Sequence, residues 1–236
     1  MNAEPDWLEY FSGGVPTGEY FRLTLDDLRQ ALVPPQKDQS PIVNLADLCF
    51  IGLISYFEAF CKDHFACLIN LEPSLTVNLK RSGQDVSIDS THVVLFGSTL
   101  DYRLGFLLAE KYDFGTPQKI NALFNALLKI TPLGREDAKR YAALLRDRNL
   151  LVHHGGVYTL GYLEQAASPN AVRDAFFQSK KLNAHEVANA IDFLEAIAKK
   201  LLRSSQRALT KQIEDRGISY SGERKKALDG IVWWGS

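Results

Sequence analysis

The chain has 236 residues, of which 46% are apolar, 23% charged and 11% aromatic, and its formal net charge is −1. These values exclude the disordered, collagen-like and membrane-embedded classes of protein, and a chain of this length folds without disulfide or metal cross-links. Its three cysteines, Cys49, Cys61 and Cys67, lie in one apolar stretch and are odd in number, which favours free thiols in a reducing compartment. We therefore expect a cytoplasmic protein without a signal peptide or membrane span.

The two halves of the chain differ in charge. Residues 1–134 carry 10 basic and 16 acidic side chains, a net charge of −6, whereas residues 135–236 carry 17 basic and 12 acidic ones, a net charge of +5. The second half can therefore bind a polyanion, although basic side chains on helices more often form a solvated face.

The first predicted helix begins at Thr24 as its N-cap and ends after Val33, because Pro34 and Pro35 follow. From Asn44 to Pro73 the apolar residues recur at helical spacing, which predicts a central core helix of about 40 Å. Next, Leu75, Val77 and Leu79 alternate with polar residues, and Val86 and Ile88 follow a polar turn. This alternation is consistent with a small β-hairpin insertion.

Helical signals dominate the remainder. We expect helices from Ser98 or Thr99 to Lys111, from Pro117 to Ile130, and from Arg135 to about His154, where two glycines follow. Asn183 and Glu186 have the spacing of a capping box, and a second long helix follows with an apolar seam. Because no repeat or low-complexity linker divides residues 1–236, we predict one all-α domain with its core at about 44–207 and an extension at each end.

The segment Arg146–Gly156 is the most informative for function. Arg148 lies within one helical turn of Leu145 and Val152, beside the apolar face of its helix, where a guanidinium needs a carboxylate or an anionic ligand. Asn149 and His153 are four residues apart and share a face. The helix thus ends in a cation, an amide and an imidazole.

Arg148-Asn149-x-x-x-His153 resembles the Arg-x4-6-His signature of the HEPN (higher eukaryote and prokaryote nucleotide-binding) superfamily. The context is similar too: a long N-terminal helix, an intervening pair of helices, the Arg-Asn-x-x-x-His helix closed by two glycines, and a further long helix, over residues 44–207. The resemblance implies a HEPN-like helical bundle. Because His154 follows directly, either histidine fits the family's role, and we prefer His153 because Asn149 can reach it.

What the resemblance implies is a metal-independent endoribonuclease that cleaves RNA at a cleft between two protomers, leaving a 2′,3′-cyclic phosphate. In that interpretation, His153 transfers protons, Arg148 neutralises the charge of the phosphoryl oxygens, and Asn149 orients a ring or an oxygen. Toxin–antitoxin, stress-response or antiphage roles would follow, with an antitoxin or another protein as regulator. The alternatives are that Arg148 pairs with an internal carboxylate while His153 caps the helix, or that the chain is a non-catalytic module for dimerisation or for binding a nucleotide or partner protein.

Other candidate sites carry weaker signals. Cys61-x-x-His64-x-x-Cys67 has metal-binding side chains at three-residue steps, but it lacks a fourth ligand, so we expect core residues and no metal or other cofactor. A basic stretch near the C-terminus is a candidate RNA-backbone contact, and it consists of Lys199, Lys200, Arg203 and Arg207. Trp233 and Trp234 are expected to dock on the protein surface or to stack on bases.

Overall fold

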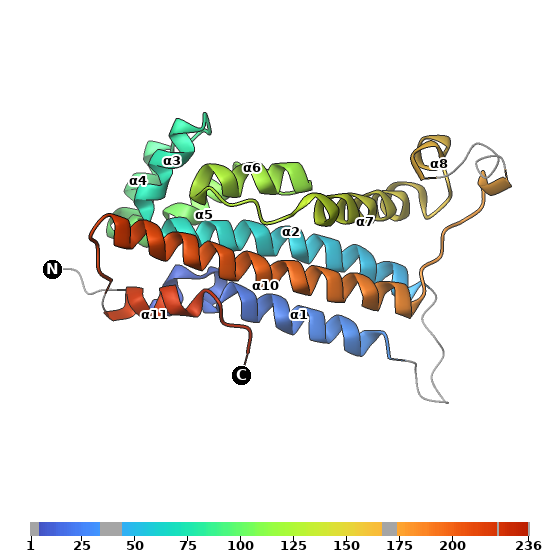
Figure 1. Ribbon diagram of the computed structural model, residues 1–236, viewed down its shortest axis with the longest axis horizontal. Coiled ribbons are helices and arrows are strands. Elements are labelled where there is room, and N and C mark those ends of the chain that lie inside the picture. The colour runs from blue at the N-terminus through green and yellow to red at the C-terminus, as the bar shows by residue number, and fades with distance from the viewer. Residues whose placement is uncertain (1–4, 34–43, 167–173, 221, 236) are drawn as a thin grey trace.

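The computed structural model describes residues 5–33, 44–166, 174–220 and 222–235, and within them the protein is all-α, with no strand. The long helices lie nearly parallel (Figure 1). Helix α2 (Leu45–Leu71) runs through the centre, between α1 (Thr17–Ala31) and α10 (Ala184–Asp215) on one side and α6 (Pro117–Leu128) with α7 (Arg135–His154) on the other. No helix in the described ranges is both long and apolar enough to span a bilayer.

Shorter helices complete the chain. Near the N-terminus and after α2 these are η1 (Trp7–Tyr10), η2 (Ser12–Gly14), η3 (Pro73–Leu75), α3 (Thr76–Arg81), α4 (Ser90–Phe96), η4 (Gly97–Tyr102) and α5 (Leu104–Ala109). Helix α8 (Leu160–Ala166) follows α7, and α11 (Gly222–Gly230) follows α10.

Helix α2 forms the middle of the core because it is apolar on all faces. Its C-terminal part is buried without interruption from His64 to Leu71, as expected for a stretch of helix that has neighbours on every side. Helix α10 instead buries one seam, which includes Val187, Ile191 and Leu194. The predicted capping box is confirmed, since Asn183 Oδ1 accepts from the amide of Glu186 at 3.0 Å and Glu186 Oε2 accepts from the amide of Asn183 at 2.9 Å.

The predicted β-hairpin is wrong. Leu75 and Leu79 are buried one helical turn apart at η3 and α3, and Asn78 Nδ2 donates to the carbonyl of Leu127 at 3.0 Å. In a short segment, alternation of apolar and polar residues fits both the period of a strand and that of a helix. Here the burial of the i, i+4 leucine pair against α6 selects the helix. Val86 and Ile88 are half-buried against the core without a partner strand in the described residues.

Two helix boundaries also differ from the predictions. Helix α1 begins at Thr17, so Thr24 lies inside it and donates its hydroxyl to the carbonyl of Tyr20 at 3.1 Å; Pro34 and Pro35 lie outside the described residues. The helix expected up to Lys111 is broken at Arg103. Beyond the break, the backbone of Gly105 packs so closely on α2 that a Cβ there would lie 1.9 Å from the carbonyl oxygen of Ala66.

Both ends of the described chain pack on the bundle. The rings of Trp7 and Trp233 stack with centroids 6.0 Å apart, and Trp234 lies edge-on to Phe21 of α1. The C-terminal tryptophans therefore dock intramolecularly, as one of the two sequence interpretations expected.

Candidate functional site

Helix α7 ends where the sequence predicted, at His154. Gly155 and Gly156 take the left-handed conformation, with φ of 58° and 84°, and the amide of Gly156 donates to the carbonyl of Leu150 at 3.2 Å. Glycine suits such a helix end because it has no Cβ to clash. A Cβ on Gly156 would also lie 2.8 Å from the carbonyl oxygen of Lys180. The signature segment is thus the last, partly exposed turns of a regular helix.

One face of these turns lines an open groove of about 270 Å³. The α7 residues of the groove recur at helical spacing: Arg146, Asn149, Leu150, His153 and His154. The opposite wall comes from the segment that leads into and forms α8, with Thr159, Gly161, Tyr162 and Gln165. Three of the predicted residues, Asn149, His153 and the alternative His154, therefore line one groove.

Arg148 lies on a different face, because it is five residues from His153 and roughly 140° away around a regular helix. Its Nη1 donates to Asn149 Oδ1 at 3.0 Å, and its Nη2 lies 3.7 Å from Glu58 Oε2 on α2. Its Nε is buried without a hydrogen-bond partner in the part of the chain that the structure describes. Arg148 therefore reaches the groove only through the amide of Asn149.

Glu58 is a weakly matched counterion for Arg148. Burial raises the pKa of Glu58, the charge of Arg148 opposes that shift, and Asp113 adds to it. The ion pair is long, and each side chain is about one-quarter exposed, 25% for Arg148 and 24% for Glu58. A guanidinium has five N–H donors, so most of those on Arg148 are not used in short hydrogen bonds to the described residues.

Asp147 fixes the opposite wall of the groove. Its Oδ1 accepts from the hydroxyl of Tyr162 at 2.5 Å, and its Oδ2 lies 3.0 Å from Lys180 Nζ. Burial and the hydrogen bond to Asp147 raise the pKa of Tyr162 to about 12. Burial lowers the pKa of Lys180, but the hydrogen bond to Asp147, the charge of Asp147 and the nearby Tyr162 and Tyr158 together outweigh that effect, so the pKa is raised. This carboxylate therefore joins α8 and residue 180 to the end of α7.

Arg146 and Tyr162 are among the groove residues that sequence reasoning missed. Arg146 lies one turn before Asn149 and two turns before His153, so the i, i+3, i+7 spacing could have identified it. It has no hydrogen bond or ion pair to another residue within the described ranges. Tyr162 gives no such signal, because its place in the groove depends on how α8 folds back over α7.

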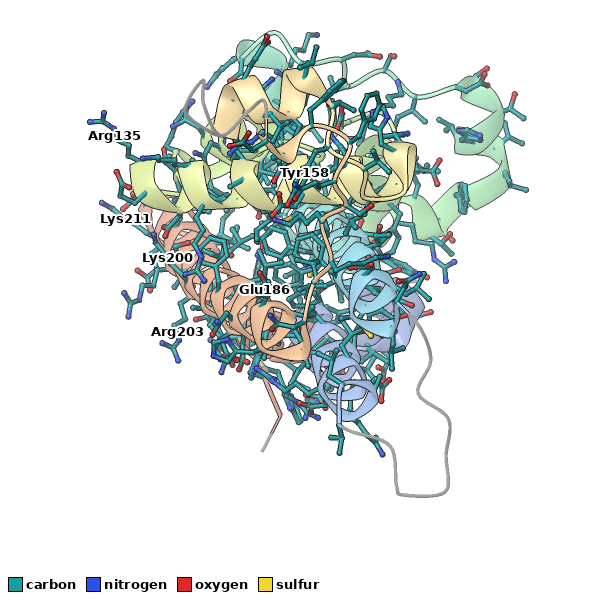
Figure 2. The ribbon with its side chains drawn as sticks, turned by 90° about the vertical axis from the view of Figure 1, so that its right-hand side faces the viewer. Arg135, Tyr158, Glu186, Lys200, Arg203 and Lys211 are labelled. Carbon is teal, nitrogen blue, oxygen red and sulfur yellow. The ribbon has the colours of Figure 1, made fainter. Side chains whose placement is uncertain are left out.

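The basic residues predicted on α10 have different surroundings in the structure. Lys199 turns toward the bundle, where its Nζ lies 2.5 Å from Glu195 and 5.1 Å from the ring centre of Trp234. Lys200 lies 3.0 Å from Asp137, whereas Arg203 and Arg207 are exposed and have no ion pair among the described residues. Lys211 continues this stripe, and Figure 2 shows Lys200, Arg203 and Lys211 projecting from the same side of the molecule as Arg135. We call Lys200, Arg203, Arg207 and Lys211 the α10 basic stripe.

Cys61, His64 and Cys67 are core residues. His64 is 1% exposed, its ring lies between those of Phe60 and Phe124, and its Nε2 is 2.6 Å from the hydroxyl of Ser205. Burial lowers the pKa of His64 to about 3 and raises the pKa of both thiols. The expectation of buried free thiols is confirmed for all three cysteines.

Comparison with known proteins adds no relative: no family model, curated protein or solved structure matches this chain.

Proposed function

We propose that the chain is a metal-independent endoribonuclease of HEPN type that acts as a homodimer. The observation that carries the proposal is the groove at the end of α7, where the exposed imidazole of His153, the amide of Asn149 and the unpaired guanidinium of Arg146 line one surface. These groups are the ones that phosphodiester transfer in RNA requires from a protein. The resemblance of Arg148-Asn149-x-x-x-His153 to the HEPN signature supports the same assignment.

RNA supplies its own nucleophile, the 2′-hydroxyl next to the scissile phosphate. The protein then needs to move two protons and to stabilise charge on the five-coordinate phosphorus. An imidazole exchanges protons near neutral pH, so His153 suits the transfer. Arg146 faces the groove and suits the phosphoryl oxygens, while Arg148 holds Asn149 through the 3.0 Å hydrogen bond and offers its remaining donors at the edge. Arg148 is in this respect a positioning residue as well as a cation.

A dimer brings a second copy of these groups. One imidazole cannot serve as base and acid in the same step, and a two-fold axis beside α7 would supply His153 from each protomer. Apolar side chains are exposed at this end of the molecule, with Phe177 at 74% and Leu160 at 50%, together with Val152 and Val157. Such side chains around a polar groove are typical of an association surface.

The α10 basic stripe suits the RNA backbone. Lys200 pairs with Asp137 on α7, and Asp137 is 16 residues, or about 24 Å, from His153 along that helix. An RNA of several nucleotides can span this distance, so the stripe would hold phosphates remote from the cut. Lys199 is omitted from this contact because it packs on Trp234.

The test is to incubate the purified protein with mixed cellular RNA in excess EDTA. We expect cleavage to persist, with fragments that carry 2′,3′-cyclic phosphate and 5′-hydroxyl ends by mass spectrometry. Replacing the ribose before the cut by deoxyribose should block the reaction. A 5′-phosphate product, a requirement for added magnesium or manganese, or equal cleavage of DNA would show that water is the nucleophile and would refute the roles given to His153 and Arg148.

A second candidate is a non-catalytic HEPN-like module for dimerisation or for binding a nucleotide or partner protein. The ion pair of Arg148 with Glu58 favours it, because an internal carboxylate already accounts for that arginine. A protein that is dimeric by small-angle scattering but leaves RNA intact under all metal conditions would identify this alternative. A toxin or antiphage role, with a regulatory antitoxin, is proposed only together with cleavage.

A further inference from the structure

We infer that the groove binds an unpaired nucleobase next to the scissile phosphate, stacked on the ring of Tyr162. This inference rests on the proposed function and names the part of the substrate that the groove would recognise. The groove has two chemically different walls. The α7 wall carries cationic and polar side chains suited to phosphate and ribose, and the α8 wall carries an aromatic ring.

Tyr162 is rigid before any ligand binds. Its hydroxyl donates to Asp147 Oδ1 at 2.5 Å, and the ring of Tyr158 packs on it with centroids 5.4 Å apart and a tilt of 35°. Lys180 holds the other oxygen of Asp147. A ring fixed in this way loses little side-chain entropy on binding, which is the property of a good stacking platform. Figure 2 looks onto this end of the molecule and labels Tyr158.

The groove also has the size and polar groups for a single nucleotide. Its volume of about 270 Å³ is slightly below the range of drug-sized ligand sites, so it has room for one base rather than for a larger ligand. The side chain of Gln165 is exposed and has no hydrogen bond to another described residue, so its amide offers both a donor and an acceptor to a base edge. The α7 wall places Asn149 and His153 opposite, where the sugar and phosphate of the same nucleotide would lie.

Stacking on Tyr162 requires an unpaired base. In an A-form duplex each base is already stacked between its neighbours and paired, so its face is not accessible to a side chain. The inferred substrate is therefore a single-stranded segment or loop, and stacking is expected to tolerate any base because every base has a π face.

The test is a binding cycle that does not depend on cleavage. The probe is a fluorescent 2′-O-methyl hexaribonucleotide, which lacks the nucleophile, and its partner is a hexamer of the same backbone without bases. We expect Tyr162→Leu to weaken binding of the base-containing hexamer about tenfold, because the base loses the ring on which it stacks, and to leave the abasic hexamer unaffected. Tyr162→Phe, which loses the hydrogen bond to Asp147 but keeps the ring and its packing against Tyr158, should bind both hexamers within about twofold of the wild type.

Equal binding of the two hexamers by the wild type, or equal loss in the Phe and Leu variants, would overturn the stacking inference. A 2-aminopurine base in the hexamer gives a readout that needs no variant, because stacking on Tyr162 quenches its fluorescence; no quenching would also overturn it. If the cycle behaves as expected but the wild type does not cleave RNA, the proposed catalysis fails while base binding stands. If RNA is cleaved but Tyr162→Leu changes the binding of both hexamers equally, only the stacking inference fails.

Discussion

Helices α2 and α7 both carry histidines and other reactive side chains, but the fold uses them in opposite ways. α2 has neighbours on all sides, so His64 is enclosed between Phe60 and Phe124 and bonded to Ser205. α7 covers the bundle with one face only, and His153 on the other face lines an open groove. The same residue type is thus a core side chain in one helix and an exposed side chain of a groove in the other.

The comparison shows what makes a reactive residue available for chemistry. In α2, burial keeps an imidazole neutral and thiols protonated, because the charged forms would lose their hydration. In α7, the polar stripe is left exposed because the apolar residues Tyr141 and Leu145 already fill the core-facing positions. Spacing of reactive residues is therefore informative only together with the number of faces that a helix buries.

The largest expected effect belongs to the exposed face of α7. His153→Ala should lower RNA cleavage by about 10²–10⁴-fold, since proton transfer by a side chain contributes that much, while the thermal midpoint stays near the wild-type value because no cavity forms. Arg148→Ala should also abolish most cleavage, and it should cost about 1 kcal/mol of stability because it leaves Glu58 without its cation. Single-turnover kinetics and thermal denaturation measure both.

His154→Ala is the matched control for this pair, and it should retain more activity than His153→Ala. Activity that survives in His153→Ala but not in His154→Ala would assign proton transfer to His154 instead of His153. An Arg148→Ala variant that unfolds while His153→Ala cleaves normally would show that Arg148 is purely structural.

A second prediction tests the buried face of α2 through pH. The pKa of His64 is lowered from 6.5 to about 3 in the folded protein, so below pH 6.5 only the unfolded state takes up the proton. The stability that the neutral ring contributes is present above pH 6.5 and is lost as the pH falls from 6.5 toward 3, by about 1.4 kcal/mol per pH unit. Urea denaturation between pH 7.5 and 4.5 measures this slope.

The control for the pH experiment is His64→Leu, which removes the titrating ring and its contact with Ser205. Its stability should therefore fall less steeply between pH 6.5 and 4.5 than that of the wild type. Identical slopes in the two proteins would mean that His64 is protonated in the folded state, contrary to its buried position.

The smallest expected effect is on the α10 basic stripe, which lies far from the groove. Arg203→Ala with Arg207→Ala should weaken RNA binding uniformly across sequences and reduce the slope of log K against log salt by about one for each charge removed. Lys199→Ala, which alters a lysine already paired with Glu195, should leave that slope unchanged. Fluorescence titrations from 50 to 200 mM salt distinguish the double variant from Lys199→Ala. Equal slopes in these two variants and in the wild type would show that the α10 basic stripe does not bind RNA.

The sequence by itself determined the all-α class, the long α2, α6 with its N-terminal proline, the bounds of α7 and the capping box that begins α10. These features follow from local rules: apolar period, capping side chains and glycines past a helix end. The same rules failed at residues 75–88, where alternation and helical spacing are both present and packing of Leu75 and Leu79 decided between them.

Only the tertiary structure decided the membership of the groove. Asn149 and His153 share a face by local geometry, but Tyr162 joins them because Asp147 and Lys180 hold the chain after α7 against that helix. Likewise Lys199 packs on the ring of Trp234 near the C-terminus, and Arg148 is turned toward Glu58, a residue 90 positions away in the chain. Such pairings depend on which helices lie side by side, and no periodicity within a single helix encodes them.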